Sequence, residues 1–166
     1  AVASGSNEPI ILVKKEVAPK VLGCNLEKID CELAVFSTSI GYSAANRSHN
    51  ILLAAKILDN TLIMPEETFS FNKQVGERSQ EKGYANAPII VNNVLKEDIG
   101  GGVCQVASTF YNAALLAGLQ IIEHSNHSVP VKYVPPGKDA TVAYNQIDLK
   151  IRNNLMNPIL IHSYIE

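Results

Sequence analysis

Gly100-Gly-Gly-Val-Cys-Gln105 runs directly into Val106-Ala-Ser-Thr-Phe-Tyr-Asn-Ala-Ala-Leu-Leu-Ala-Gly118. This stretch predicts a helix that begins just behind three glycines and ends at a glycine. Cys104 then lies in the first turn, where unpaired N–H groups and the helix dipole favour a thiolate over a thiol. The glycines leave room for a substrate or another backbone to come close. If the chain carries out chemistry, this segment is the first candidate for it.

Composition limits the class of protein. The chain has 166 residues, of which 46% are hydrophobic and 18% charged, as expected for one globular domain with an apolar core. The formal net charge is −2 and there is no dense Lys/Arg run. This argues against nucleic acid as a partner and against a polybasic membrane anchor. The apolar runs are too short to span a bilayer, so we expect no membrane span.

Periodicity divides the rest of the chain into one more long helix and many short strands. A helix of about four turns opens at 43–46, capped by either Ser43 or Asn46, and ends at 59–60. Strand-like segments are expected at 33–40, 68–71, 119–123, 131–134, 140–144, 147–151 and 159–164, with a hairpin turn at 92–93 between 88–91 and 94–95. The pattern predicts an α+β fold, with two main helices packed on a mostly antiparallel sheet. We expect residues 1–32, including a short apolar run at 10–13, to form an N-terminal arm or entry segment, and residues 33–166 to form the domain.

Three residues occur in an order that suits a cysteine nucleophile. Cys104 at a helix start is followed along the chain by His127 and then by Asp139, both expected on or beside strands. A thiol nucleophile needs a base to activate it and a carboxylate to orient that base. The layout resembles that of papain- and transglutaminase-type enzymes. His124 is the alternative base, and we favour His127 because it directly precedes a strand-like segment.

Several residues are expected to form a substrate-binding cleft beside the thiol: Gly101, Gly102, Gln105, Asn46, Arg47 and Tyr111. The glycine N–H groups, or the N–H and side chain of Gln105, could stabilise an oxyanion. Asn46 and Arg47 fit a solvated helix start equally well. Tyr111 follows Cys104 by seven residues and so lies on nearly the same helix face, where its hydroxyl reaches the cleft or satisfies a buried partner.

The remaining thiols and imidazoles support weaker interpretations. Cys104, His124 and His127 are ligand types suited to zinc, but no fourth ligand is evident, and we predict neither a metal nor a cofactor. Cys24 and Cys31 either pair with each other or remain separate thiols. Separate thiols are favoured, because spacing alone does not establish the geometry of a bridge.

Further motifs extend over most of the chain. They are Ala45-Asn-Arg-Ser-His-Asn50, Pro65-Glu-Glu-Thr-Phe-Ser-Phe-Asn72, Ser108–Gly118, His127-Ser-Val-Pro-Val131, Tyr133-Val-Pro-Pro-Gly-Lys-Asp-Ala-Thr141 and Asp148–Asn154 with Pro158-Ile159. Together with the glycine–cysteine segment they resemble the VanW family, named for its association with vancomycin-resistance gene clusters. The resemblance runs from about Leu33 to Tyr164. It implies a bacterial protein on the extracellular or cell-surface side of the membrane, held there by an N-terminal signal or anchor upstream of this sequence.

Two functions fit these observations. In the first, Cys104, His127 and Asp139 form an amide hydrolase or acyltransferase that acts on peptidoglycan-type peptides. In the second, the chain is a non-catalytic envelope-binding or structural module, in which Cys104 is a packing residue. The expected partner is cell-wall material or a peptide substrate in either case, and the sequence indicates no oligomeric state.

Overall fold

The computed structural model describes Val21, residues 23–91 and residues 94–165. Their elements follow in the order α1 (Gly23–Leu26), α2 (Ala45–Leu58), β1 (Thr61–Ile63), β2 (Thr68–Ser70), α3 (Phe71–Val75), a 3-10 turn (Gln80–Lys82), β3 (Asn86–Val91), β4 (Val94–Ile99), α4 (Val103–Leu116), β5 (Gln120–Glu123), β6 (Lys150–Arg152) and β7 (Ile159–Ile161). The strands form three small sheets in the orders β1-β7, β2-β6-β5 and β3-β4, and every pairing is antiparallel. The fold is α+β, as predicted.

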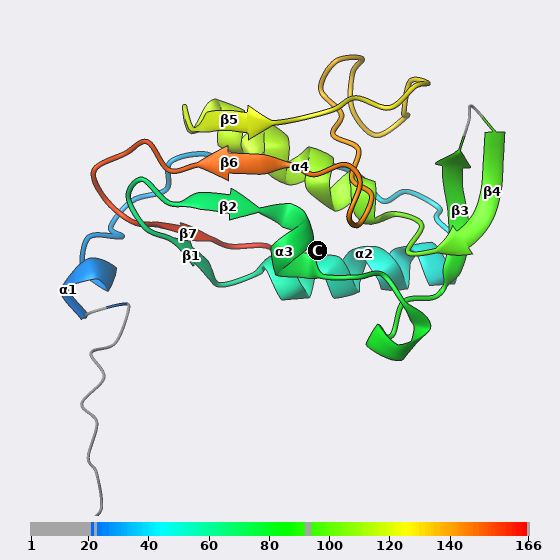
Figure 1. Cartoon of the computed structure of the whole chain (residues 1–166), viewed down its shortest axis with the longest axis horizontal. Coiled ribbons are helices and arrows are strands. Elements are labelled where there is room, and N and C mark those ends of the chain that lie inside the picture. Colours follow the sequence, from blue (N-terminus) through cyan, green and yellow to red (C-terminus); the bar gives the residue numbers. More distant parts are fainter. Residues whose placement is uncertain (1–20, 22, 92–93, 166) are drawn as a thin grey trace, which may run out of the picture.

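The two long helices form the centre of the molecule, and the small sheets pack around them. Helices α2 and α4 contact each other, and α4 also contacts β5. In Figure 1 the β2-β6-β5 sheet lies over α4, and the β3-β4 hairpin stands at the end of the molecule where α4 begins. Phe69 of β2 meets Phe110 of α4 edge to face, with ring centroids 5.2 Å apart. These contacts join the sheet to the cysteine helix in one apolar core.

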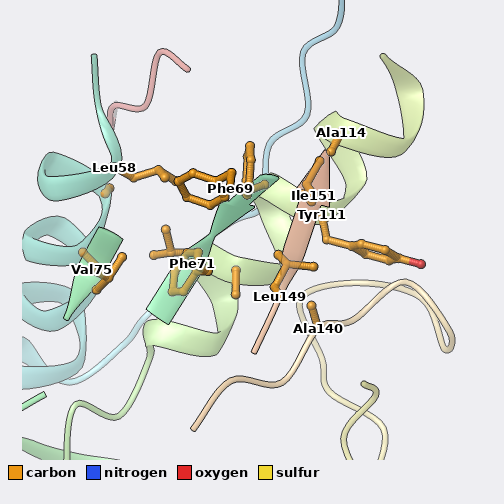
Figure 2. Close-up of a cluster of buried hydrophobic side chains, with 14 of the residues drawn as sticks. Leu58, Phe69, Phe71, Val75, Tyr111, Ala114, Ala140, Leu149 and Ile151 are labelled. Atoms are coloured by element: carbon orange, nitrogen blue, oxygen red, sulfur yellow. The ribbon is translucent and has the colours of Figure 1, made fainter. Parts of the chain in front are cut away.

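Figure 2 shows how the core is assembled from elements far apart in the sequence. Leu58 comes from α2, Phe71 and Val75 from α3, Ala114 from α4 and Ile151 from β6, and all are 5% exposed or less. Burial of this apolar surface is the main favourable contribution to the fold. It fixes α4 rigidly against both the sheet and α2.

The chain between β5 and β6 differs most from its prediction. Residues 124–149 contain no strand, only an isolated bridge between Ala143 and Ile147. The strands expected at 131–134 and 140–144 are therefore wrong, and the one expected at 147–151 is shorter and later, as β6. The physical reason is visible in the hydrogen bonds, because side chains of α4 take the place of a neighbouring strand. The Ala140 N–H donates to Ser108 Oγ at 2.8 Å, and the Val142 N–H lies 3.5 Å from Cys104 Sγ.

The remaining predictions of secondary structure are confirmed in part. Helix α2 and the β3-β4 hairpin are confirmed, although the turn residues 92–93 lie outside the described residues, as does the run at 10–13. Neither predicted cap is used: Ala44 is the N-cap of α2 and has no capping side chain. Residues 33–40 form no strand. The proposed division at residue 32 stays a prediction. Within the described residues, no helix is both long enough and apolar enough to cross a bilayer.

Candidate functional site

The three glycines serve to bring the start of α4 against its neighbours. A Cβ atom at Gly101 would lie 2.6 Å from the carbonyl oxygens of Ala87 and Pro88 in β3. One at Gly102 would lie 2.9 Å from Ile51 of α2, and the φ of Gly102 is +106°, which disfavours any other residue. The room that the sequence led us to assign to a substrate is filled by the protein's own chain. Gly101 and Gly102 are thus close-packing positions, and their expected role in substrate binding stays a prediction.

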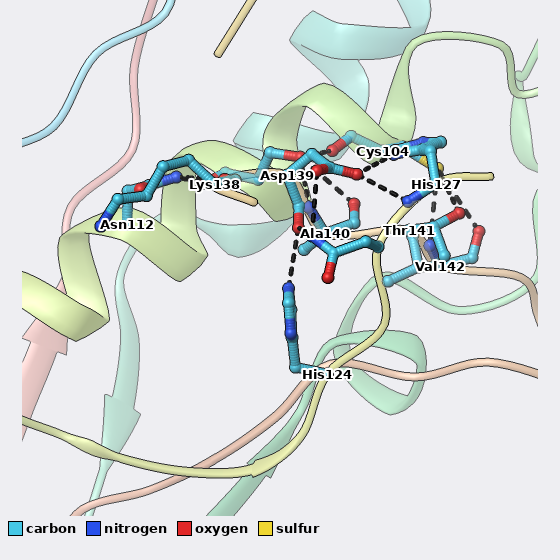
Figure 3. Close-up of polar contacts among 11 residues, drawn as sticks. Cys104, Asn112, His124, His127, Lys138, Asp139, Ala140, Thr141 and Val142 are labelled. Carbon is cyan, nitrogen blue, oxygen red and sulfur yellow. Dashed lines mark hydrogen bonds and ion pairs between the residues drawn. The ribbon is translucent and has the colours of Figure 1, made fainter. Parts of the chain in front are cut away.

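Cys104, His127 and Asp139 converge beside this helix start, as Figure 3 shows. His127 Nδ1 lies 2.7 Å from Asp139 Oδ2, and the His127 backbone N–H donates to the same oxygen at 2.6 Å. The His127 imidazole and the Cys104 thiol are close enough for each to shift the pKa of the other. Because Nδ1 is engaged by Asp139, the other ring nitrogen is the one left for the sulfur. The three side chains therefore lie together, with His127 paired to Asp139 and next to the thiol.

Burial and hydrogen bonding adjust the charge states of all three groups. Burial raises the pKa of Cys104, but the hydrogen bond and charge of His127, the Val142 N–H and the Thr141 hydroxyl bring that pKa below its ordinary value. Burial lowers the pKa of His127, while Cys104 and Asp139 together raise it above the ordinary value. Burial raises the pKa of Asp139, but its hydrogen bonds lower it overall. The directions favour a thiolate–imidazolium pair beside an ionised carboxylate.

The second candidate histidine lies on the far side of Asp139. The ring of His124 stacks on Tyr111, with centroids 4.0 Å apart and planes inclined by 7°. Its Nε2 lies 2.7 Å from the Asp139 carbonyl oxygen, as Figure 3 also shows. Neither His124 nor Tyr111 hydrogen-bonds to the thiol in this geometry, and Tyr111 serves as a stacking partner. The zinc ligand set Cys104, His124 and His127 does not converge, and the described part of the chain holds no cluster of three metal-binding side chains.

The other predicted cleft residues are engaged by the protein itself. The Gln105 side-chain oxygen accepts a hydrogen bond from Arg47 at 2.6 Å, and its amide nitrogen donates to Thr38 and Ser39, at 3.0 Å each. The side chain that was expected to stabilise an oxyanion is therefore fully used. Asn46 donates to the Asn86 carbonyl of β3 at 2.9 Å, so that it ties α2 to the hairpin. Arg47 lies near both Cys104 and Tyr133 and is half-buried.

Sequence reasoning missed several residues that hold the site together. Asn126 donates to both the carbonyl and the Oδ1 of Asp139, at 3.1 Å and 3.0 Å. Ser108 links α4 to Ala140, and Asn112 donates to the Lys138 carbonyl at 2.6 Å. The spacing of Ser108 and Asn112 at four and eight residues after Cys104 was the available signal, since such residues share a helix face.

A polar hollow of about 400 Å³ lies elsewhere on the molecule. Residues from β2, α3, β5, β6 and the 144–148 turn line it: Ser70, Asn72, Lys73, Glu123, Tyr144, Asn145, Gln146, Ile147, Asp148 and Lys150. Its Glu123 and Lys150 pair with each other at 2.7 Å, and the Asp148 carboxylate accepts hydrogen bonds from Ser70 and two backbone N–H groups. Three of the charged side chains in the hollow, Glu123, Asp148 and Lys150, are thus engaged by groups of the protein itself.

Fold and site together define an α+β protein in which Cys104, His127 and Asp139 gather at the start of a central helix. The chain belongs to the VanW family: the family described as "VanW like protein" matches residues 46–166. It is 49% identical over 132 residues to "Uncharacterized protein YoaR" of Bacillus subtilis (strain 168), a match that covers 80% of this chain and 44% of that protein.

A second relative extends the comparison. The chain is 34% identical over 146 residues to "Vancomycin B-type resistance protein VanW" of Enterococcus faecalis (strain ATCC 700802 / V583), which covers 83% of this chain and 52% of that protein. The chain thus spans about half the length of these curated relatives. No solved structure matches it.

Cys24, Cys31 and Cys104 are all free thiols, in line with the favoured prediction.

Proposed function

We propose that this chain is a cysteine-nucleophile amide hydrolase or acyltransferase that acts on peptidoglycan-type peptides. The observation that carries the proposal is the convergence of Cys104, His127 and Asp139, three residues spread over 36 positions of the sequence. His127 Nδ1 lies 2.7 Å from Asp139 Oδ2, and the imidazole and the thiol shift each other's pKa. Folding has to bring such distant groups together, and the Asp139 carboxylate on Nδ1 leaves the other imidazole nitrogen of His127 for the thiol. This is the arrangement that activates a thiol.

Each residue has a distinct role in the proposed reaction. His127 takes the thiol proton, and the Cys104 sulfur attacks the amide carbon, so that a C–S bond forms and the carbonyl oxygen becomes negative. The tetrahedral intermediate collapses with loss of the C–N bond, and His127 gives its proton to the leaving amine. Water or a second amine then attacks the thioester and releases the thiol. Asp139 holds the imidazole in position and stabilises its charged form without taking a proton.

The family supports an envelope location for this activity. One relative carries the name of a vancomycin resistance protein. We therefore place the protein, as part of the same proposal, on the extracellular or cell-surface side of a bacterial membrane, with cell-wall peptides as its substrates. Release of the full-length protein into protoplast supernatants, or its digestion by protease added outside intact protoplasts, would support this location. Complete protection from external protease would contradict it.

One observation favours the alternative of a non-catalytic envelope module. The His127 side chain is only 9% exposed, and Cys104 is half-buried, so the site is largely covered. In that case Cys104 is a packing residue and its thiol reacts slowly. The two functions differ in the behaviour of one sulfur atom.

The deciding experiment measures thiol reactivity and acyl transfer in the same protein. In a Cys24→Ser/Cys31→Ser background, Cys104 is the only thiol, and we expect iodoacetamide to alkylate it rapidly at pH values well below about 8.5, the ordinary thiol pKa. Incubation with peptidoglycan stem peptides, followed by intact-protein mass spectrometry, should detect an acyl adduct that Cys104→Ala lacks. Slow alkylation that follows an ordinary thiol pKa, together with no adduct, would exclude the catalytic function.

A further inference from the structure

Tyr133 has a buried hydroxyl that the fold leaves without a partner. It lies in the same loop as the other site residues, six positions after His127 and six before Asp139. Within the described residues, its hydroxyl oxygen is shielded from solvent and makes no hydrogen bond of normal geometry. A buried hydroxyl without a partner costs about 1–3 kcal/mol of stability. Because phenylalanine would avoid this cost, the hydroxyl calls for an explanation.

The neighbour that could satisfy it is already engaged. Ser108 lies beside the Tyr133 hydroxyl. However, Ser108 Oγ donates to the Cys104 carbonyl at 2.8 Å and accepts from the Ala140 N–H at 2.8 Å. Among the described residues, no hydrogen bond of normal geometry therefore holds the Tyr133 hydroxyl, and its proton can turn toward a bound group.

The surroundings of this hydroxyl are those of the thiol site. Cys104, Asp139 and Arg47 all lie within electrostatic reach of it. Burial raises the pKa of Tyr133, so it is a neutral O–H donor at neutral pH. The guanidinium of Arg47 donates to neutral oxygens of Ser43 and Gln105, so its positive charge is not cancelled by either of these contacts. A donor and a cation therefore stand beside the nucleophile.

We propose that Tyr133 is a catalytic residue that donates its O–H to the substrate carbonyl oxygen when Cys104 attacks and that oxygen becomes an oxyanion. The inference rests on the proposed function and replaces Gln105, whose side chain is fully engaged, as the side-chain donor. In this step the carbonyl electron pair moves to oxygen, and Tyr133 stabilises it by a hydrogen bond and keeps its proton. The Cys104 N–H, one of the amides that a helix start leaves without an intrahelical carbonyl, is the second donor.

The test exploits two reactions of the same sulfur. Acetylation by p-nitrophenyl acetate passes through an oxyanion, whereas alkylation by iodoacetamide is a direct displacement that forms none. Both rates are measured for Tyr133→Phe in the Cys24→Ser/Cys31→Ser background, with adducts assigned by intact mass. Loss of one oxyanion donor slows acyl transfer by roughly 10²- to 10³-fold, so we expect a fall of that order in acetylation with alkylation unchanged.

Tyr84→Phe is the matched control. Tyr84 also has a buried hydroxyl without a partner, but Arg78 is the charged group that acts on it, and the thiol is not. We expect this variant to react like the parent in both assays. Both tyrosine variants should melt at or above the temperature of the parent, because each loses only an unsatisfied hydroxyl.

Three results would overturn the proposal. Equal slowing of both reactions in Tyr133→Phe would mean that the hydroxyl acts on the thiol itself. No change in either reaction would mean that it contributes only to packing. Slow reaction of the parent protein with both reagents would contradict the proposed function as well. This result comes from the parent alone, so it is distinguished from a failure of the Tyr133 proposal.

Discussion

Replacement of Asp139 gives the sharpest test of how the site is held together. Asp139 is 5% exposed, and its carboxylate accepts three hydrogen bonds from the loop that contains it. Oδ2 accepts from the His127 backbone N–H at 2.6 Å and from Nδ1 of the same residue at 2.7 Å, while Oδ1 accepts from Asn126 at 3.0 Å. Asp139→Ala would leave the two His127 donors buried without an acceptor.

The size of the effect follows from these contacts. Removal of one member of a buried, hydrogen-bonded charge pair costs about 3–5 kcal/mol. For a chain of this length, that corresponds to a fall in Tm of roughly 10 °C. Asp139→Asn keeps the shape and one carbonyl acceptor, so we expect a smaller loss of about 1–2 kcal/mol. In both variants His127 loses the charge that orients it, and the Cys104 alkylation rate at neutral pH should fall.

The pH dependence has a definite sign. The folded-state pKa of Asp139 lies below its ordinary value of about 3.9, so the carboxylate contributes its full stability above that pH. The contribution is lost as the pH falls through the folded-state pKa. The difference in unfolding free energy between the parent and Asp139→Ala should therefore shrink in acid, as the pH falls below about 3.9 and the carboxylate takes up a proton.

The assay is urea unfolding at several pH values, combined with the alkylation rate of Cys104. Asp98→Asn is the control, because Asp98 is exposed and its carboxylate accepts a hydrogen bond from the neighbouring Ile99 N–H. Loss of this charge should change stability by less than about 0.5 kcal/mol. An Asp139→Ala protein as stable as the parent, or a difference that persists unchanged in acid, would refute this account of the site.

Three further predictions concern the helix start, the core and the imidazole. Gly101→Ala should lose about 1–3 kcal/mol of stability in thermal unfolding, because its Cβ would meet backbone oxygens at 2.6 Å. The control Gly23→Ala should lose almost nothing, because a Cβ at that position would meet no atom within 4 Å. Equal losses in the two variants would contradict the packing role of Gly101. Asn153→Ala should lower the free energy of unfolding in urea by about 2–3 kcal/mol, because it removes a fully buried side chain that makes three hydrogen bonds. A loss below about 0.5 kcal/mol would be inconsistent with those bonds. Titration of His127 by NMR should give a pKa above about 6.5 that decreases in Cys104→Ser, because burial lowers this pKa and the thiolate raises it. The stabilising contribution of protonated His127 is therefore full below about pH 6.5 and is lost as the pH rises through the folded-state pKa. An identical His127 pKa in the parent and in Cys104→Ser would mean that the thiolate–imidazolium pair does not form.

Local sequence predicted the helices well and the loop poorly. The run from Val103 to Leu116 has the composition and the bounding glycines of a helix, and these properties do not depend on the rest of the chain. Residues 131–134 also have strand-like composition, but β propensity expresses fit to a neighbouring strand, and none is available there. Instead, the following backbone bonds to Ser108 and Cys104 of α4, 32 to 38 residues away.

The sequence predicted which three residues come together in the candidate site, but not the contacts of the residues around them. The order of Cys104, His127 and Asp139 pointed to the three residues that converge, and their catalytic role remains a proposal. The functions expected of Gly101, Gly102 and Gln105 rested on local chemistry alone. Their true contacts are with β3, α2 and the 38–39 segment, which a local pattern does not reveal.

The sequence by itself determined the α+β class, the position of a thiol in the first turn of a helix, and the family. These follow from periodicity, glycine spacing and motif identity, all of which are local properties. Only the tertiary structure decided that His127 rather than His124 meets the sulfur, that the glycines are filled by neighbouring backbone, and that Tyr133 keeps a free hydroxyl beside the thiol. Each of these depends on which distant groups compete for the same hydrogen bonds and space, and that competition is settled only when the chain packs.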